Sequence, residues 1–329
     1  MILFWLIVFI ISLIILIKGA DWLLVSAEKI GFAAGLSPFI IGVTIIGLGT
    51  SFPELITSLF ATFRGATEIV TANAIGSNIA NILLVIGFSA LIGKRLVVTK
   101  NLIDLDLPLL AISTVLLLGI IWDRQVTFFE ALLLLISYSI YLLYTVSHKD
   151  SEESKEAAKI LPSREIRRKH IFEKRVLLKS KLTLKDFVLL IAGIIGLFLG
   201  AKYLIESIIK LAEILDISTG VIAITAVSVG TSLPELFVSM KAACQKKSEV
   251  AIGNIFGSNV FNSLVVIGLP GMFKTLSLDN STYVIGVPIM ALATLLFIIS
   301  GISRKIHMWE GAFFLLLYIF FIGKLFNLF

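Results

Sequence analysis

The sequence has little charge, one cysteine and three histidines. Charged residues make up 15% of the 329 residues, and His148, His170 and His307 are scattered over loops or helix ends. The lone Cys244 excludes a disulfide framework, and the scattered histidines offer no scaffold for metal-histidine or serine-histidine chemistry. What the sequence has in excess is apolar surface, because 58% of its residues are hydrophobic. A soluble domain does not bury that much in one core, so we expect a chain that lies in a bilayer.

Long apolar runs recur along the whole chain rather than at one end. A helix needs roughly 20 apolar residues to cross about 30 Å of hydrocarbon. The first basic residue, Lys18, follows the first apolar run instead of preceding it, so a cleavable signal peptide is not expected. We therefore expect an all-α polytopic membrane protein with ten transmembrane helices. The predicted spans are residues 2–28, 38–63, 69–92, 105–122, 126–146, 187–213, 218–243, 249–272, 283–302 and 308–326.

One long polar stretch, residues 147–185, divides the chain. It holds twelve Lys or Arg against six Asp or Glu, a difference that equals the formal net charge of +6 of the whole chain. Basic loops stay on the cytoplasmic side, so five spans on either side of this loop put the N-terminus and the C-terminus outside. Over all loops, 21 basic residues fall on the predicted inner side and 5 on the outer side. The predicted organisation is a five-helix repeat at 1–146, a cytoplasmic basic linker at 147–185 and a second five-helix repeat at 186–329.

The second half of the sequence repeats the first at a constant offset of 181 residues. GTSFPELITS at 49–58 matches GTSLPELFVS at 230–239 at seven of ten positions, and residues 73–87 match 254–268 at nine of fifteen. Because each half has an odd number of predicted spans, the two copies enter the membrane from opposite sides. Such an inverted repeat places a shared site near the bilayer midplane, where corresponding broken helices meet.

Each copy of the repeated segment carries a proline and a glutamate beside hydroxyl residues. Pro53 and Pro234 interrupt helical hydrogen bonding and free backbone carbonyls in the preceding turn. A carboxylate at this depth is costly, so Glu54 and Glu235 are site candidates by default, and two such carboxylates need cations or protons to coexist. Ca²⁺ takes about six to eight oxygen ligands, and one Ca²⁺ or two Na⁺ neutralise a dianionic site. The candidate oxygen ligands are Glu54, Glu235, Thr50, Thr231, Ser51, Ser232, Ser77, Ser258, Asn81 and Asn262.

Each hydroxyl or amide in that set also has a structural interpretation. Serine and threonine bond back to carbonyls within their own helix, and Ser77 and Asn81 are spaced to join neighbouring helices. The duplication of a carboxylate beside a helix-breaking proline is harder to explain by packing. The sequence therefore favours a ligand role most strongly for Glu54 and Glu235.

Two further pairs of charges lie within predicted spans. Lys18 and Asp21 are three residues apart, and Lys202 and Glu206 are four apart, so each pair is predicted to meet on one face of its helix. Mutual neutralisation explains them without a role in transport. The alternative is that they line a water path beside helices that move.

The motifs G-T-S-F-P-E with G-S-N-I-A-N, and G-T-S-L-P-E with G-S-N-V-F-N, resemble the two alpha-repeats of the sodium/calcium exchanger branch of the calcium/cation antiporter superfamily. The resemblance covers essentially the whole chain. It implies ten helices in an inverted five-plus-five repeat and alternating access in which helices one and six slide over a core. It also implies electrogenic exchange, with about three Na⁺ entering for each Ca²⁺ exported.

The resemblance also assigns roles to residues. It implies that Glu54 and Glu235 bind both Ca²⁺ and Na⁺, and that Thr50 and Thr231 contribute to the calcium site. Potassium-dependent relatives carry aspartate at the position of Asn262, so asparagine there favours potassium independence. The sodium sites would be completed by Ser51, Ser77, Ser232, Ser258 and the backbone carbonyls of Gly47 and Ser228, while Asn81 and Asn262 would line the centre.

We therefore expect a secondary transporter rather than an enzyme: a Na⁺/Ca²⁺ antiporter in the cell membrane of a prokaryote. It is expected to work as a monomer, with Ca²⁺, Na⁺ and the lipid bilayer as its partners, without nucleic acid or an organic cofactor. The linker lacks room for the calcium-sensing domains of animal exchangers. The runner-up is a H⁺/Ca²⁺ antiporter or another cation/H⁺ exchanger that uses the same glutamates. A cation channel and an intramembrane enzyme are the remaining alternatives, and the enzyme lacks an evident nucleophile with its base.

Overall fold

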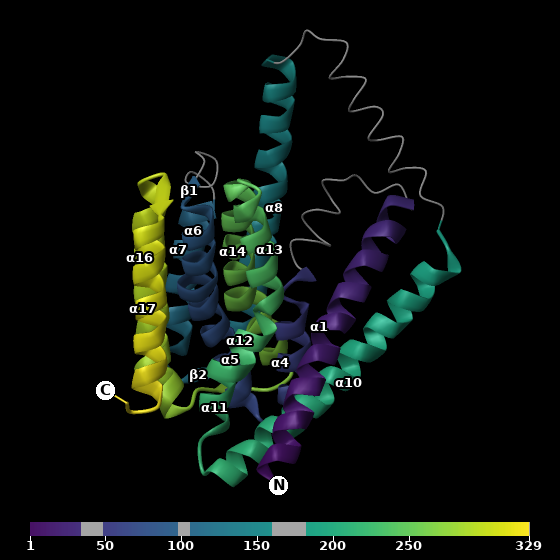
Figure 1. Cartoon of the computed structure of the whole chain (residues 1–329), viewed down its shortest axis with the longest axis vertical. Coiled ribbons are helices and arrows are strands. Elements are labelled where there is room, and N and C mark those ends of the chain that lie inside the picture. Colours follow the sequence, from purple (N-terminus) through teal and green to yellow (C-terminus); the bar gives the residue numbers. More distant parts are fainter. Residues whose placement is uncertain (34–48, 98–105, 160–181, 329) are drawn as a thin grey trace.

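The structure, a computed structural model, describes residues 1–33, 49–97, 106–159 and 182–328. These residues are mostly helical, as predicted. Among them, seven helices are long and apolar enough to cross a membrane, or eight if one bent pair counts as a single span. Figure 1 shows most of the helices packed side by side in a bundle, while α1 (Ile2–Ala33) and α10 (Leu184–Leu215) form an arm at its side.

Besides α1, the described residues of the first half form four helical stretches. Its helices and strands are α4 (Phe52–Arg64), α5 (Thr67–Ile79), the π-helical η2 (Ala80–Ile86), α6 (Gly87–Gly93), β1 (Arg95–Val97), α7 (Leu107–Ile120), η4 (Ile121–Asp123), β2 (Gln125–Val126) and α8 (Phe128–Lys159).

The second half follows α10 with a similar order of elements. They are α11 (Thr219–Ile222), η5 (Ala223–Val227), α12 (Ser228–Thr231), α13 (Leu233–Cys244), α14 (Ser248–Phe261), η6 (Asn262–Val266), α15 (Gly268–Gly271), β3 (Leu276–Ser277), η7 (Thr282–Gly286), α16 (Val287–Ile302), β4 (Lys305–His307) and α17 (Met308–Leu325).

Of three predicted spans, one is longer in the structure, one is described only in part, and one is bent. The helix predicted at 126–146 continues to Lys159, because the sequence there is rich in glutamate, lysine and alanine, which favour helix. The span predicted at 38–63 is described only from residue 49 onward. The span predicted at 218–243 is bent by 43° between α12 and α13.

The bend lies at Ser232, next to the proline that the sequence singles out. Ser232 has φ −80° and ψ 4°, outside the helical region, and Pro234 follows in the first turn of α13. Ser51 occupies the same place before α4, with φ −93° and ψ 10°. A proline has no N–H, so the carbonyl four residues earlier loses its helical donor. The predicted helix break at Pro234 is therefore confirmed.

Two short antiparallel ladders were not expected from an all-α prediction. β1 pairs with β4, with Leu96 opposite Ile306, and β2 pairs with β3, with Val126 opposite Leu276. All four of these side chains are fully buried. Pairing satisfies backbone groups in the turns between helices. In Figure 1, β1 lies at the upper end of the bundle and β2 near its lower end.

The helices that follow β2 and β4 begin in the same way. The backbone N–H of Thr127 donates to Glu130 Oε2 at 2.8 Å before α8, and that of His307 donates to Glu310 Oε2 at 2.7 Å before α17. These are N-terminal caps of the same kind, 180 residues apart. The structural repeat therefore extends beyond the segment in which the sequence repeat is densest.

Helices α1 and α10 touch through their backbones. A Cβ added at Gly19 would lie 2.6 Å from Leu197 N, and one added at Gly193 would lie 2.7 Å from Leu23 N. Both distances are too short for any side chain. Small residues at a crossing let two membrane helices approach this closely, so the arm is a tightly joined pair.

Of the two charge pairs predicted within helices, one is present. Lys18 Nζ lies 3.6 Å from Asp21 Oδ2, as predicted. Lys202 does not pair with Glu206 and lies over a tyrosine ring instead. Glu206 forms an ion pair with Arg64, because the end of α4 brings that guanidinium against α10. The prediction for Lys202 is therefore wrong.

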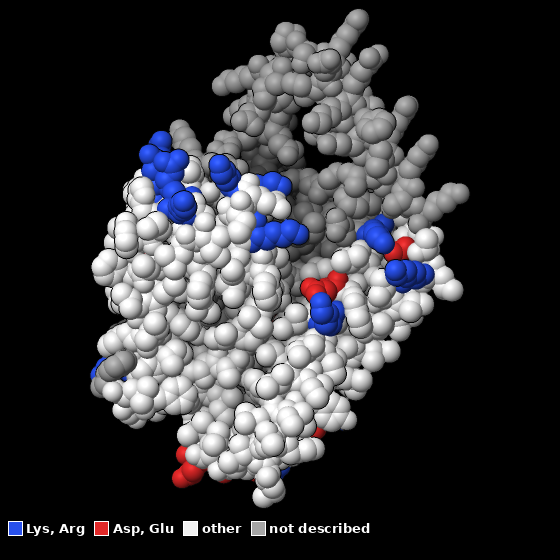
Figure 2. Space-filling view, viewed as in Figure 1, with Lys and Arg blue, Asp and Glu red and all other residues white. Residues whose placement is uncertain are grey.

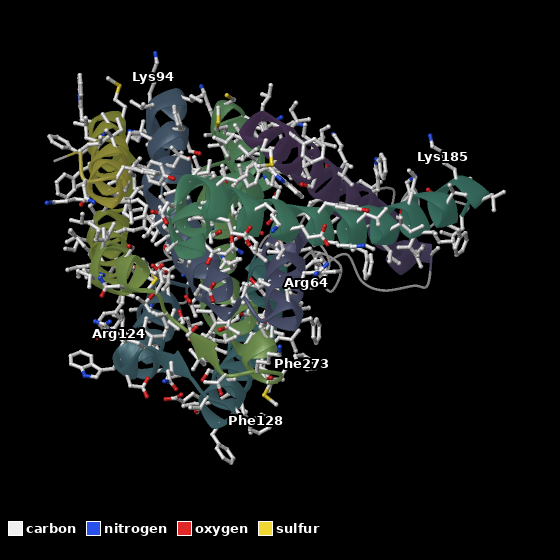
Figure 3. All side chains as sticks on the ribbon, turned by 90° about the horizontal axis from the view of Figure 1, so that it is seen from below. Arg64, Lys94, Arg124, Phe128, Lys185 and Phe273 are labelled. Atoms are coloured by element: carbon white, nitrogen blue, oxygen red, sulfur yellow. The ribbon has the colours of Figure 1, made fainter. Side chains whose placement is uncertain are left out.

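Lysine and arginine gather mainly at the upper end of the face shown in Figure 2. Lys94 and Lys185, at the ends of helices, point away from the molecule in Figure 3, as does the apolar ring of Phe128. Among the described residues, the buried charged side chains are Glu54, Glu235 and Asp186, and Asp186, in the first turn of α10, pairs with Lys29 of α1. Glu54 and Glu235 are therefore the buried carboxylates for which no ion pair with a lysine or arginine is seen among the described residues.

Candidate cation site

Glu54 and Glu235 lie in the first turns of α4 and α13, directly after the two helix breaks. Both side chains are completely buried. The N-terminal turn of a helix favours a negative charge, because unpaired N–H groups point out of it. The duplicated sequence thus builds the same carboxylate position twice.

Each carboxylate is contacted by a serine from the opposite half of the chain. Ser51 Oγ donates to Glu235 Oε1 at 3.0 Å, and Ser232 Oγ lies 3.5 Å from Glu54 Oε1. Ser258 Oγ donates to Glu235 Oε1 at 3.3 Å. Each serine that precedes one glutamate therefore contacts the other glutamate. The two copies of the motif meet in one place rather than forming two separate sites.

The threonines of the motif contact asparagines of the opposite half. Thr50 Oγ1 donates to Asn254 Oδ1 at 3.4 Å, and Thr231 Oγ1 donates to Asn73 Oδ1 at 3.5 Å. Neither asparagine is among the predicted ligands. Asparagine occurs at this position in both copies of the repeat, which is the signal that could have identified them. Their amide groups in turn contact Ser239 Oγ at 3.2 Å for Asn254 and Ser58 Oγ at 3.5 Å for Asn73.

Five side-chain oxygens of the predicted ligands are buried without a hydrogen-bond partner among the described residues. Leaving such a group unpaired costs about 1–3 kcal/mol, so these oxygens are available to pair with a ligand. All are hard oxygen atoms, the kind that Ca²⁺ and Na⁺ prefer. These atoms are Glu54 Oε2, Glu235 Oε2, Ser77 Oγ, Asn81 Oδ1 and Asn262 Oδ1.

Two of the predicted ligands, Ser228 and Gly47, are expected to bind through their backbone carbonyls. Ser228 Oγ bonds back to the carbonyl of Ile224 at 2.7 Å, which is the structural interpretation of a helical serine. The Ser228 carbonyl lies 3.4 Å from Thr231 Oγ1, so it borders the site. Gly47 lies outside the described residues.

The two central asparagines lie in π-helical turns. Asn81 is in η2, and Asn262 begins η6. A π-helical turn is wider than an α-helical one and is frequent at functional sites. The sequence carries no pattern that predicts it. The described residues contain no group of three or more His, Cys, Asp or Glu, so a cation here would be held by two carboxylates and neutral oxygens.

The chain is similar to known proteins in sequence and in fold. A family described as "Sodium/calcium exchanger protein" matches residues 4–147 and 185–326. The sodium/calcium exchanger MaX1 of Methanosarcina acetivorans is 31% identical over 345 aligned positions, which cover 97% of both chains. An uncharacterized membrane protein of Methanocaldococcus jannaschii is 34% identical over 317 residues, 96% of both chains.

The fold is also similar to that of a solved structure. The sodium-calcium exchanger NCX_Mj, soaked with 10 mM Na⁺ and 10 mM Sr²⁺, has a TM-score of 0.63 and 32% sequence identity to this chain. The match covers 98% of this chain and 99% of the other. The likeness extends to the whole fold rather than to the repeated motifs alone.

Proposed function

We propose that this chain, which belongs to the sodium/calcium exchanger family, exports Ca²⁺ against Na⁺ influx by alternating access. The family comprises membrane ion exchangers and is not an enzyme class. One observation carries the proposal: Glu54 and Glu235 are fully buried, and each contacts the serine that precedes the other. One Ca²⁺ or two Na⁺ neutralise such a pair, so the ions compete for it. That competition is the basis of antiport.

The proposed ligands are the twelve residues that the sequence singles out. The glutamates would bind either ion. The unpartnered oxygens of Ser77, Asn81 and Asn262 support their inclusion. The others are Thr50, Thr231, Ser51, Ser232 and Ser258 through their side chains, and Gly47 and Ser228 through their carbonyls.

The proposed architecture is ten transmembrane helices in an inverted five-plus-five repeat, with halves at 1–146 and 186–329. The two ladders, β1 with β4 and β2 with β3, lie toward opposite ends of the bundle, which supports inversion. Both termini lie toward the lower end in Figure 1, opposite the end where basic residues gather in Figure 2. That arrangement supports termini outside and the linker at 147–185 inside.

Exchange is proposed to be electrogenic and independent of K⁺. Neutral oxygens around the two carboxylates are suited to a further Na⁺, so about three Na⁺ would enter per Ca²⁺. Asn262 supplies an uncharged amide where a carboxylate would add a further negative charge. We place the protein in the cell membrane of a prokaryote, as a monomer, since the site draws only on residues of one chain.

Transport by the purified chain in liposomes tests the proposal. Vesicles loaded with Na⁺ are diluted into K⁺-free medium that contains Ca²⁺, and Ca²⁺ uptake is followed together with the membrane potential. We expect uptake that needs internal Na⁺ and makes the vesicle interior negative, as positive charge leaves with excess Na⁺. Uptake that ignores Na⁺ but follows a pH gradient would replace this proposal with the H⁺-coupled alternative.

A further inference from the structure

The repeat places two asparagines on each of the two central helices. Asn78 and Asn81 lie on the stretch formed by α5 and η2, and Asn259 and Asn262 are their counterparts on α14 and η6, 181 residues later. All four are buried, with exposed fractions of at most 3%. A symmetric arrangement would form the same hydrogen bond twice, once in each direction.

The structure contains that hydrogen bond once. Asn81 Nδ2 donates to Asn259 Oδ1 at 3.0 Å. The counterpart would run from Asn262 Nδ2 to Asn78 Oδ1, but neither of these atoms has a partner among the described residues, and Asn262 Oδ1 has none either. The amide of Asn81 is therefore held on one side, whereas the whole amide of Asn262 is unoccupied by protein groups.

One of the differences between the repeats falls on the hydrogen-bond partner of Asn78. Asn78 Nδ2 donates to Ser263 Oγ at 2.8 Å and lies 3.9 Å from Met290 Sδ. The counterpart of Ser263 in the first half is Ile82, which has no hydroxyl. Ser263 thus holds Asn78 through its Nδ2 and leaves Asn78 Oδ1 without a partner among the described residues, whereas Asn259 Nδ2, the counterpart of Asn78 Nδ2, has no partner among them.

We propose that Ser263 is a positioning residue of the cation site, which engages Asn78 and thereby leaves the Asn262 amide oxygen available to a bound cation. The inference deepens the proposed function, on which it rests for the nature of the ligand. Asn262 is the ligand, and Ser263 touches no cation. The two halves then offer unequal amide ligands, one fixed by Asn259 and one free to turn toward the ion.

Removal of the serine hydroxyl should act on cation binding through Asn78. In Ser263→Ala, Asn78 Nδ2 is released and donates to Asn262 Oδ1, which competes with the cation. We expect the half-saturating Na⁺ concentration to rise roughly tenfold, the factor that corresponds to about one net hydrogen bond. The readout is the Na⁺-dependent rise in the thermal unfolding midpoint of the full chain in detergent, repeated with Ca²⁺.

Two matched variants separate positioning from a general structural role. Ser263→Thr keeps the hydroxyl and is expected to stay within about twofold of the wild type. Asn78→Ala with Ser263→Ala removes the competing amide as well, so binding should return to near the wild-type value. A merely structural serine would leave that double variant at least as impaired as Ser263→Ala.

The outcomes are distinct. Equal binding by the wild type and Ser263→Ala, or no recovery in the double variant, overturns the inference. If Ser263→Ala does not fold, Ser263→Cys, which keeps the size of the side chain with a weak hydrogen-bonding group, replaces it with the same criteria. Because binding needs no transport, a wild type that binds Na⁺ and Ca²⁺ without exchanging them overturns the proposed function alone. A wild type that binds neither cation overturns both.

Discussion

The central spans and the arm differ sharply in how much protein surrounds them. In the spans Thr67–Gly93 and Val250–Gly271, 78% of the residues in the 18-residue apolar stretch are buried inside the protein. The corresponding fraction is 22% in Ile2–Ser26 and 33% in Leu184–Leu215. The central spans hold buried asparagines and serines that contact each other across the repeat. Within the arm, α1 and α10 pack against each other at glycines, where their backbones are in contact.

This difference suggests which part of the molecule stays fixed. Interlocked buried polar groups allow one arrangement only, because each displacement leaves groups unpaired. A pair of helices that is apolar on its exposed faces can move along the bundle at lower cost. The contrast fits the proposal that α1 and α10 slide as one unit over a core that keeps the ion site intact.

The largest expected effect lies in the core. Glu54→Gln and Glu235→Gln each remove one of two charges that neutralise the cation, so Na⁺-driven Ca²⁺ uptake should fall at least about 100-fold. Uptake into liposomes measures this. Glu213→Gln, an exposed carboxylate on α10, is the control and should transport normally. Exchange retained in both core variants would show that these glutamates do not bind the transported cations.

The next effect tests the arm as a joined unit. In Gly193→Ala, the added Cβ would meet Leu23 N at 2.7 Å, so α1 and α10 must separate. We expect a stability loss of about 1–3 kcal/mol and slower exchange. Thermal unfolding and uptake assays measure the two effects.

Gly119→Ala is the matched control for that variant. It is also a helical glycine, in α7, and no atom lies within 4 Å of the added Cβ. Its stability should stay unchanged or rise by up to about 1 kcal/mol, because alanine favours helix. Equal behaviour of the two variants would show that the contact between α1 and α10 is not tight.

A smaller effect sharpens the description of the core. Ser51→Ala removes the 3.0 Å contact to Glu235, and we expect the half-saturating Na⁺ concentration to rise about fivefold. Ser232→Ala should have less effect, since its contact to Glu54 is 3.5 Å. Ser12→Ala, whose hydroxyl bonds to carbonyls within α1, serves as control. The reverse order of the two site variants would contradict the geometry.

The smallest effect concerns the ion pair that joins arm and core. Arg64 on α4 and Glu206 on α10 are 48% and 30% exposed, and ion pairs of this kind are worth about 0–1 kcal/mol. Glu206→Gln should change the maximal exchange rate by no more than about fivefold, with little effect on half-saturating ion concentrations. Arg64→Glu with Glu206→Arg should restore the rate. Glu213→Gln breaks a pair within α10 alone and should have no effect.

The sequence predicted the positions of the helices better than their contacts. Apolar run length placed helical segments, and Pro234 marked a break that the structure confirms. The pairing of Lys202 with Glu206 failed because spacing along one helix does not reveal a competing Arg64 on another. The role of Asn73 and Asn254 was missed for the same reason, since their partners lie in the other half of the chain.

The sequence by itself determined the membrane environment, the duplication and the identity of the two glutamates. These follow from hydropathy, from a constant offset and from the cost of a carboxylate in hydrocarbon, all of which are local or periodic properties. Only the tertiary structure decided that each glutamate meets the serine of the opposite repeat and that Asn78 bonds to Ser263 while the Asn262 amide has no partner among the described residues. Hydrogen bonds across about 180 residues depend on atomic distances between packed helices, which no residue pattern encodes.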